Sequence, residues 1–75
     1  MEKFLLKSAF GTNNMKEMLP GDIIKVACQT WLECNSVKVL VCNHRKAYPR
    51  PDISKYETKT EKQGNGFIIT ITAMG

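Results

Sequence analysis

Three cysteines and one histidine are the residues of this sequence that could bind a metal ion or act as nucleophiles. Cys28, Cys34, Cys42 and His44 form a Cys₃His set, which is chemically suited to tetrahedral zinc. The set contains no Cys-x-x-Cys pair, and Cys28 and Cys42 fall in apolar segments, where cysteine behaves as a small hydrophobic residue. We therefore expect reduced thiols, mostly buried, with no metal site and no cofactor.

A Cys–His pair could also act in nucleophilic catalysis. Cys42 and His44 would share one face if this segment were a strand. Such a pair needs a third group that orients the base and a donor site for the developing oxyanion, and nothing else in the chain supplies them. Glu57 and Glu61 lie among lysines, which is typical of a solvated strand face. The sequence therefore predicts a protein that is not an enzyme and has no catalytic residue.

A basic and aromatic segment, "NHRKAYPRPDISKY" (residues 43–56), has the composition of a nucleic-acid contact. Residues 45–62 carry six Lys or Arg against three Asp or Glu, while the whole chain has a net charge of +4. Cations neutralise phosphates and aromatic faces stack on bases, while Pro49 and Pro51 favour extended conformations at the residues before them. The candidate nucleic-acid-binding residues are Arg45, Lys46, Tyr48, Arg50, Lys55, Tyr56, Lys59 and Lys62.

The same segment has two other interpretations. It is a structural connector if Tyr48 and Tyr56 pack inward and the charges are only solvated, and it is a protein-binding loop if its partner is another chain. A domain of 75 residues holds only ~3–5 kcal/mol in its core, so a partner protein or a homodimer formed through a sheet edge would add stability. The leading hypothesis is a binding module that contacts nucleic acid, and the alternative is a small protein-binding adaptor or inhibitor, with a homodimer as one form of it.

The hydrophobic pattern predicts one small β-rich domain that covers residues 1–75. Alternation and β-branched residues favour five strands, at 3–10, 22–31, 36–43, 56–63 and 67–74. Residues 14–19 predict a single helical turn, and Gly64-Asn65-Gly66 predicts a tight hairpin. Five short strands indicate a compact barrel or half-barrel of the OB or SH3-like kind, and the alternative is a two-layer α+β sandwich.

The run "MLPGDIIKV" (residues 18–26), followed by Cys42, His44 and a C-terminal strand, resembles the TusA-like sulfur-carrier proteins. The resemblance implies a helix before the Pro-Gly-acid turn and a two-layer α/β sandwich. That family carries its cysteine in a Cys-Pro-x-Pro motif at the start of the first helix. The corresponding region here, "SAFGTNNM", contains no cysteine, so the resemblance implies no sulfur-transfer residue.

Hydropathy predicts a cytoplasmic protein. No segment has the roughly 20 consecutive apolar residues that a membrane span needs. Near the N-terminus, Lys7 interrupts the apolar run of Phe4, Leu5 and Leu6 well before it reaches the length of a signal-peptide core. We therefore expect no membrane partner.

Overall fold

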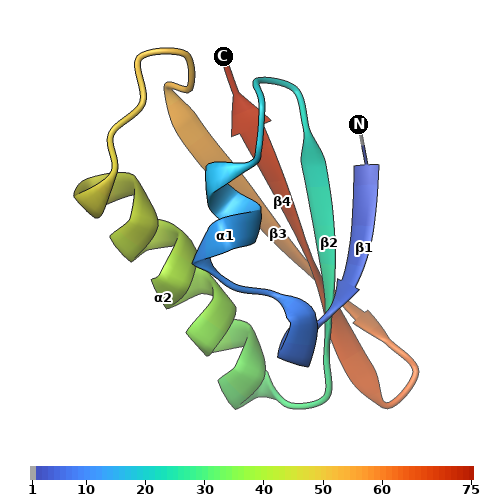
Figure 1. Cartoon of the computed structure of the whole chain (residues 1–75). Helices are drawn as coiled ribbons and strands as arrows, with labels where there is room; N and C mark the ends of the chain where they lie inside the picture. Colours follow the sequence, from blue (N-terminus) through green and yellow to red (C-terminus); the bar gives the residue numbers. More distant parts are fainter. Residues whose placement is uncertain (1) are drawn as a thin grey trace.

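The computed structural model describes residues 2–75 and shows an open four-stranded sheet whose one face is covered by helices (Figure 1). The elements are β1 (Glu2–Leu6), the 3-10 turn η1 (Lys7–Ala9), α1 (Thr12–Lys16), β2 (Ile23–Cys28), α2 (Trp31–Ala47), β3 (Lys55–Gln63) and β4 (Gly66–Met74). This is the two-layer α+β alternative. The predicted barrel is wrong, because one of the five expected strands is a helix and the sheet stays open.

The strand order in the sheet is β1-β2-β4-β3. β1 pairs parallel to β2, and β4 pairs antiparallel to both β2 and β3. β2 and β3 therefore run in the same direction, with the position of β4 between them. The helix α2 carries the chain across this gap, and the hairpin then returns β4 into it. A parallel connection of this kind needs a long crossover, which α2 supplies.

The segment 36–43 was predicted as a strand, and this prediction is wrong: it lies inside α2. The helix begins with a capping pair, since Thr30 Oγ1 accepts from the Glu33 amide (3.2 Å) and Glu33 Oε1 accepts from the Gln29 amide (2.9 Å). Its buried residues, spaced at helical intervals, are Cys34, Val37, Val41 and His44. Packing of this stripe on the sheet outweighs the β preference of the valines. The helix ends at Ala47, with Tyr48 as its C-cap, because a residue before a proline disfavours helical angles.

The core lies between the sheet and the helical layer. Alternate residues of the two central strands are buried against the helices: Ile24, Val26, Cys28, Ile69, Ile71 and Ala73. Met15 and Met18, from α1 and the turn that follows it, complete this core. The predicted hairpin is confirmed, with Gly64 at φ +59° between β3 and β4. The predicted helical turn corresponds to α1, which is only five residues long.

The other face of the sheet carries no covering element within residues 2–75 (Figure 1). On the edge strand β1, Phe4 and Leu6 are exposed. The opposite edge, β3, has Lys and Glu at alternate positions, a pattern that discourages pairing with another strand. Among the helices that the structure describes, none is long and apolar enough to cross a lipid bilayer.

Candidate functional site

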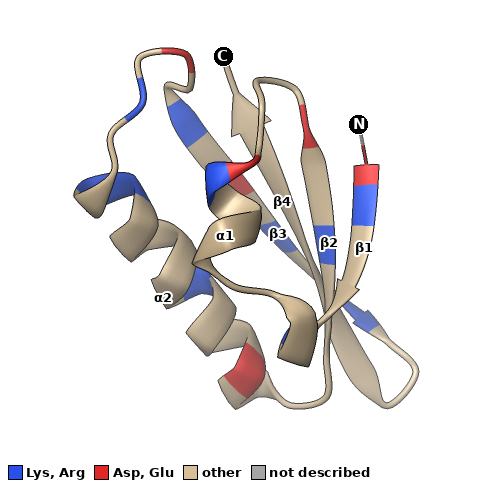
Figure 2. Ribbon diagram, viewed as in Figure 1, with Lys and Arg blue, Asp and Glu red and all other residues tan. Residues whose placement is uncertain are grey.

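The structure places the eight predicted nucleic-acid-binding residues on three parts of the fold. Arg45 and Lys46 lie in the last turn of α2, and Tyr48 caps that helix. Arg50 lies in the connection that follows, and the remaining four residues, Lys55, Tyr56, Lys59 and Lys62, lie along β3. In Figure 2 the basic residues are accordingly spread over the end of α2, the connecting loop and β3, and acidic residues lie between them.

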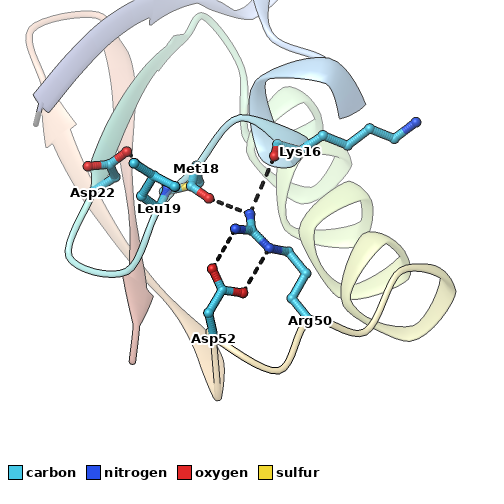
Figure 3. Close-up of polar contacts among 6 residues, drawn as sticks. All are labelled: Lys16, Met18, Leu19, Asp22, Arg50 and Asp52. Carbon is cyan, nitrogen blue, oxygen red and sulfur yellow. Dashed lines mark hydrogen bonds and ion pairs between the residues drawn. The ribbon is translucent and has the colours of Figure 1, made fainter.

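Arg50 holds the loop to the rest of the domain (Figure 3). Its Nε and one terminal nitrogen donate to the two carboxylate oxygens of Asp52 (3.1 and 2.7 Å). The other terminal nitrogen donates to the carbonyl oxygens of Lys16 (3.4 Å) and Met18, which lie at and after the end of α1. The hydrogen bonds that Arg50 donates to the Asp52 carboxylate raise the pKa of Arg50. This guanidinium therefore joins the loop to α1, and its charge is already matched by Asp52.

Two of the lysines on β3 have carboxylate partners two residues away. Lys55 Nζ lies 3.2 Å from Glu57, and Lys59 Nζ lies 3.7 Å from Glu61. Both pairs are solvent-exposed, so each stabilises the fold little, but each reduces the local positive field. Lys62 lies at the far end of β3, next to the hairpin. Arg45 and Lys46 are consecutive residues in the last turn of α2, and Arg45 Nη2 donates a hydrogen bond to the Ser54 carbonyl (3.2 Å).

The two tyrosines are oriented differently. Tyr48 is 51% exposed, and its ring contacts two groups: the Lys16 ammonium, 4.7 Å from the ring centroid, and the His44 ring. Tyr56 packs against the core, and its buried hydroxyl has no hydrogen-bond partner among the described residues. Tyr48 is therefore half-exposed but already contacts Lys16 and the His44 ring, and Tyr56 is part of the core.

The three cysteines do not converge. Cys28 and Cys34 are buried, whereas Cys42 is exposed on α2. Burial, together with the neighbouring Cys34 thiol, raises the pKa of Cys28 to about 11, so this thiol is protonated at neutral pH. Within residues 2–75, no group of three His, Cys, Asp or Glu side chains is arranged to hold a metal ion. Cys42 and His44 do not share a face, since side chains two positions apart on a helix point in widely different directions.

An open groove of about 660 Å³ runs along the outer side of α2. It exists because α1 is one turn long and covers only part of the longer helix, contributing Thr12 to one wall. The α2 residues that line it are Leu32, Asn35, Ser36, Val39, Leu40, Asn43, His44, Ala47 and Tyr48. Leu32 and Val39, which are 76% and 56% exposed, contribute apolar surface along the groove. None of these described lining residues carries an ammonium, guanidinium or carboxylate group.

His44 is the polar residue at the base of this groove. It is 2% exposed, and neither ring nitrogen has a hydrogen-bond partner among the residues that the structure describes. Its ring lies 5.3 Å from the Tyr48 ring and 6.1 Å from the Tyr56 ring, measured between centroids. Burial lowers the pKa of His44, and the positive charges of Lys16 and Arg50 lower it further. The imidazole is therefore neutral at physiological pH, with one donor and one acceptor nitrogen.

The groove was not predicted from the sequence, although two local signals pointed towards it. Thr30 and Glu33 have the spacing of a helix capping box, and Cys34, Val37, Val41 and His44 repeat at helical intervals. Both patterns indicate a helix over residues 31–47. What no local pattern indicates is that the outer side of this helix is left uncovered.

Comparison of the chain with protein-family models, with curated proteins and with solved structures gives no match. The functional conclusion therefore rests on the geometry of the chain itself.

Proposed function

We propose that this chain is a non-enzymatic protein-binding module and that its docking surface is the groove along α2. The observation that carries the proposal is the uncharged, partly apolar lining of the groove, with Leu32, Val39 and Tyr48 exposed along it. Exposed apolar surface that is continuous along a helix is typical of protein-interaction sites.

The shape of the groove favours a helical segment as the occupant. The lining runs from Leu32 to Tyr48, which corresponds to about 24 Å along the helix axis at 1.5 Å per residue. This length matches four turns of a partner helix better than it matches a compact small molecule. Ser36 and Ala47 are small, so a second helix backbone can approach α2 closely at these positions.

The proposal is tested with a displayed library of amphipathic helical peptides, selected on the immobilised protein at low surface density. We expect enriched peptides that bind the wild-type chain and lose binding to Val39→Glu, which places a charge in the groove. The matched control is Leu19→Glu, at an exposed apolar residue outside the groove, and it should retain binding. Enriched peptides that bind Val39→Glu as well as the wild type, or a selection that yields no binders, would refute the groove as a docking surface.

Nucleic-acid binding stays a prediction from the sequence. Arg45, Lys46 and Tyr48 are exposed at the end of α2, where Arg45 also donates a hydrogen bond to the Ser54 carbonyl (3.2 Å). The test of nucleic-acid binding is given with the other predictions below.

A further inference from the structure

His44 is the one histidine of the chain, and it lies where the end of α2 meets β3. It is 2% exposed, and its ring packs against aromatic rings from two parts of the fold. The Tyr48 ring, at the end of α2, is tilted by 35° to the imidazole, and the Tyr56 ring, from β3, stands at 70° to it. Because histidine changes its charge close to neutral pH, this packing is the part of the core that a fall in pH disturbs first.

The surroundings of His44 fit a neutral ring and not a charged one. The charged and titratable groups around the ring are Lys16 of α1, Tyr48 at the end of α2, Arg50 of the loop that follows, whose partner is Asp52, and Tyr56 of β3. Burial lowers the pKa of His44 most, and the two cations, Lys16 and Arg50, lower it further. An imidazolium donates from both nitrogens, yet neither nitrogen has an acceptor within residues 2–75. A proton on this ring therefore leaves an unpaired charge inside the domain.

The contacts that keep His44 covered are few and lie near the surface. The Tyr48 amide donates to the His44 carbonyl (2.8 Å), which closes the last turn of α2. The Lys16 ammonium lies over the Tyr48 ring, and Arg45 Nη2 donates to the Ser54 carbonyl (3.2 Å). Lys16, Arg45, Tyr48 and Ser54 are all exposed. Because helix ends open at a lower free-energy cost than the packed strands of a sheet, this turn can move while the sheet stays folded.

The preferred position of the His44 ring depends on its charge. The neutral ring gains from its packing on Tyr48 and Tyr56 and stays buried. A cation in the last turn of a helix interacts favourably with the carbonyl groups at the helix C-terminus, and His44 lies in that turn. The charged ring is therefore favoured at the surface, where water solvates it and the helix end still attracts it.

From these observations we infer that His44 is a pH switch for the groove: its protonation moves the ring away from Tyr56 into water, opens the last turn of α2 and displaces Tyr48 from the groove wall. The consequence for a bound partner rests on the proposed docking function. An imidazolium beside an uncharged lining, and the loss of the Tyr48 ring from that lining, both weaken the binding of an apolar helix face. The movement of the ring does not depend on the docking function.

The ring movement is tested by nuclear magnetic resonance of the isolated chain as the pH is lowered from neutrality. One histidine and two tyrosines make the aromatic signals simple to assign. We expect the nuclear Overhauser effect between the His44 and Tyr56 rings to disappear at the midpoint of the His44 titration, while the methyl signals of Ile69 and Ile71 keep their folded positions. In His44→Gln, which cannot take up a proton in this range, the Tyr56 ring signals should stay constant. An Overhauser effect that persists in the protonated chain, or sheet signals that are lost at the same midpoint, would overturn the switch.

The consequence for the groove is tested with a helical peptide selected on the wild-type chain at neutral pH. Its dissociation constant for the wild type should rise about tenfold across the His44 titration, and by linkage the bound peptide should lower the midpoint of that titration. Whatever its affinity at neutral pH, His44→Gln should show no such rise, which separates the switch from titration of the peptide itself. A wild-type affinity that is constant across the titration would overturn the control of the groove by His44 and leave the proposed function standing. A selection that yields no peptide refutes the proposed function, and the resonance measurement then decides on the switch alone.

Discussion

The substitution His44→Leu is expected to stabilise the isolated chain. It removes a buried ring whose two nitrogens have no hydrogen-bond partner within residues 2–75, and such a group costs about 1–3 kcal/mol. Leucine also favours the helix by a few tenths of a kcal/mol. Imperfect packing of the new side chain offsets up to about 1.5 kcal/mol of this gain. The expected net change is an increase in the free energy of unfolding of about 1 kcal/mol, which corresponds to a rise in Tm of about 4–8 °C for a domain of this size.

The same substitution is expected to change how stability depends on pH. The folded-state pKa of His44 lies below its ordinary value of 6.5, so the unfolded chain binds more protons between the two values. Wild-type stability is therefore fully present above pH 6.5 and falls as the pH falls through the folded pKa. His44 is the one histidine of the chain, so His44→Leu should flatten the stability profile just below pH 6.5.

The assay is thermal unfolding followed by circular dichroism at low micromolar concentration, where self-association contributes least. The control is Cys42→Leu, an exposed position on the same helix that gains helix propensity but removes no buried polar group. A Tm of His44→Leu that does not exceed that of Cys42→Leu, or an unchanged pH profile, would show that His44 is satisfied in the folded chain and that the reasoning is wrong.

Three further predictions concern the fold and the basic residues. Gly66→Ala should lower the free energy of unfolding by about 1–3 kcal/mol, measured with urea, because the added Cβ would lie 2.6 Å from the Cys28 carbonyl oxygen. Thr30→Ala should cost about 1 kcal/mol, because the cap of α2 is lost. If the exposed cations bind nucleic acid, anisotropy of a labelled single-stranded oligonucleotide should show binding that weakens as salt rises and that Arg45→Ala combined with Lys46→Ala removes.

Each of these predictions has a control. Gly11→Ala adds a Cβ with nothing within 4 Å and should stay close to the wild type, and an equal loss in both glycine variants would contradict the steric argument. Thr30→Ser keeps the hydroxyl and should retain the cap. Lys59→Ala removes a lysine that already faces Glu61 and should leave oligonucleotide binding nearly unchanged. If the wild-type chain does not bind the oligonucleotide at low salt, the prediction of nucleic-acid binding is refuted.

The contacts of Arg50 make it unsuitable for an alanine substitution that tests nucleic-acid binding. As one of several basic loop residues, it was a natural choice for an alanine substitution that tests nucleic-acid binding. In the fold, its guanidinium bonds Asp52 and two carbonyls at the end of α1 (Figure 3). Replacing it would disturb the loop and α1 together, so a loss of binding in Arg50→Ala would not report on a nucleic-acid contact. Arg45 and Lys46 are the better probes, because both are exposed and the hydrogen bond from Arg45 to the Ser54 carbonyl (3.2 Å) does not involve α1.

The local features of this protein can be predicted from its residues. Alternation of apolar side chains identified β2 and β4, because a strand turns successive residues to opposite faces. The Gly64-Asn65 turn identified the hairpin, because glycine tolerates a positive φ. The helical spacing of Cys34, Val37, Val41 and His44 was also present in the sequence, but the β-branched residues of this segment favoured a strand. Both patterns were local, and only packing on the sheet decided between them.

The tertiary structure alone decided the features on which the proposed function rests. Burial of His44 depends on Tyr56 and on the layer in which α2 lies, and the contacts of Arg50 join residues more than thirty positions apart. The groove exists because α1 ends after one turn and leaves the outer side of α2 uncovered. The periodicity of apolar side chains in the sequence indicates which face of a helix is apolar. Whether that face is covered depends on where the strand order of the sheet places the neighbouring elements, and no local pattern encodes that position.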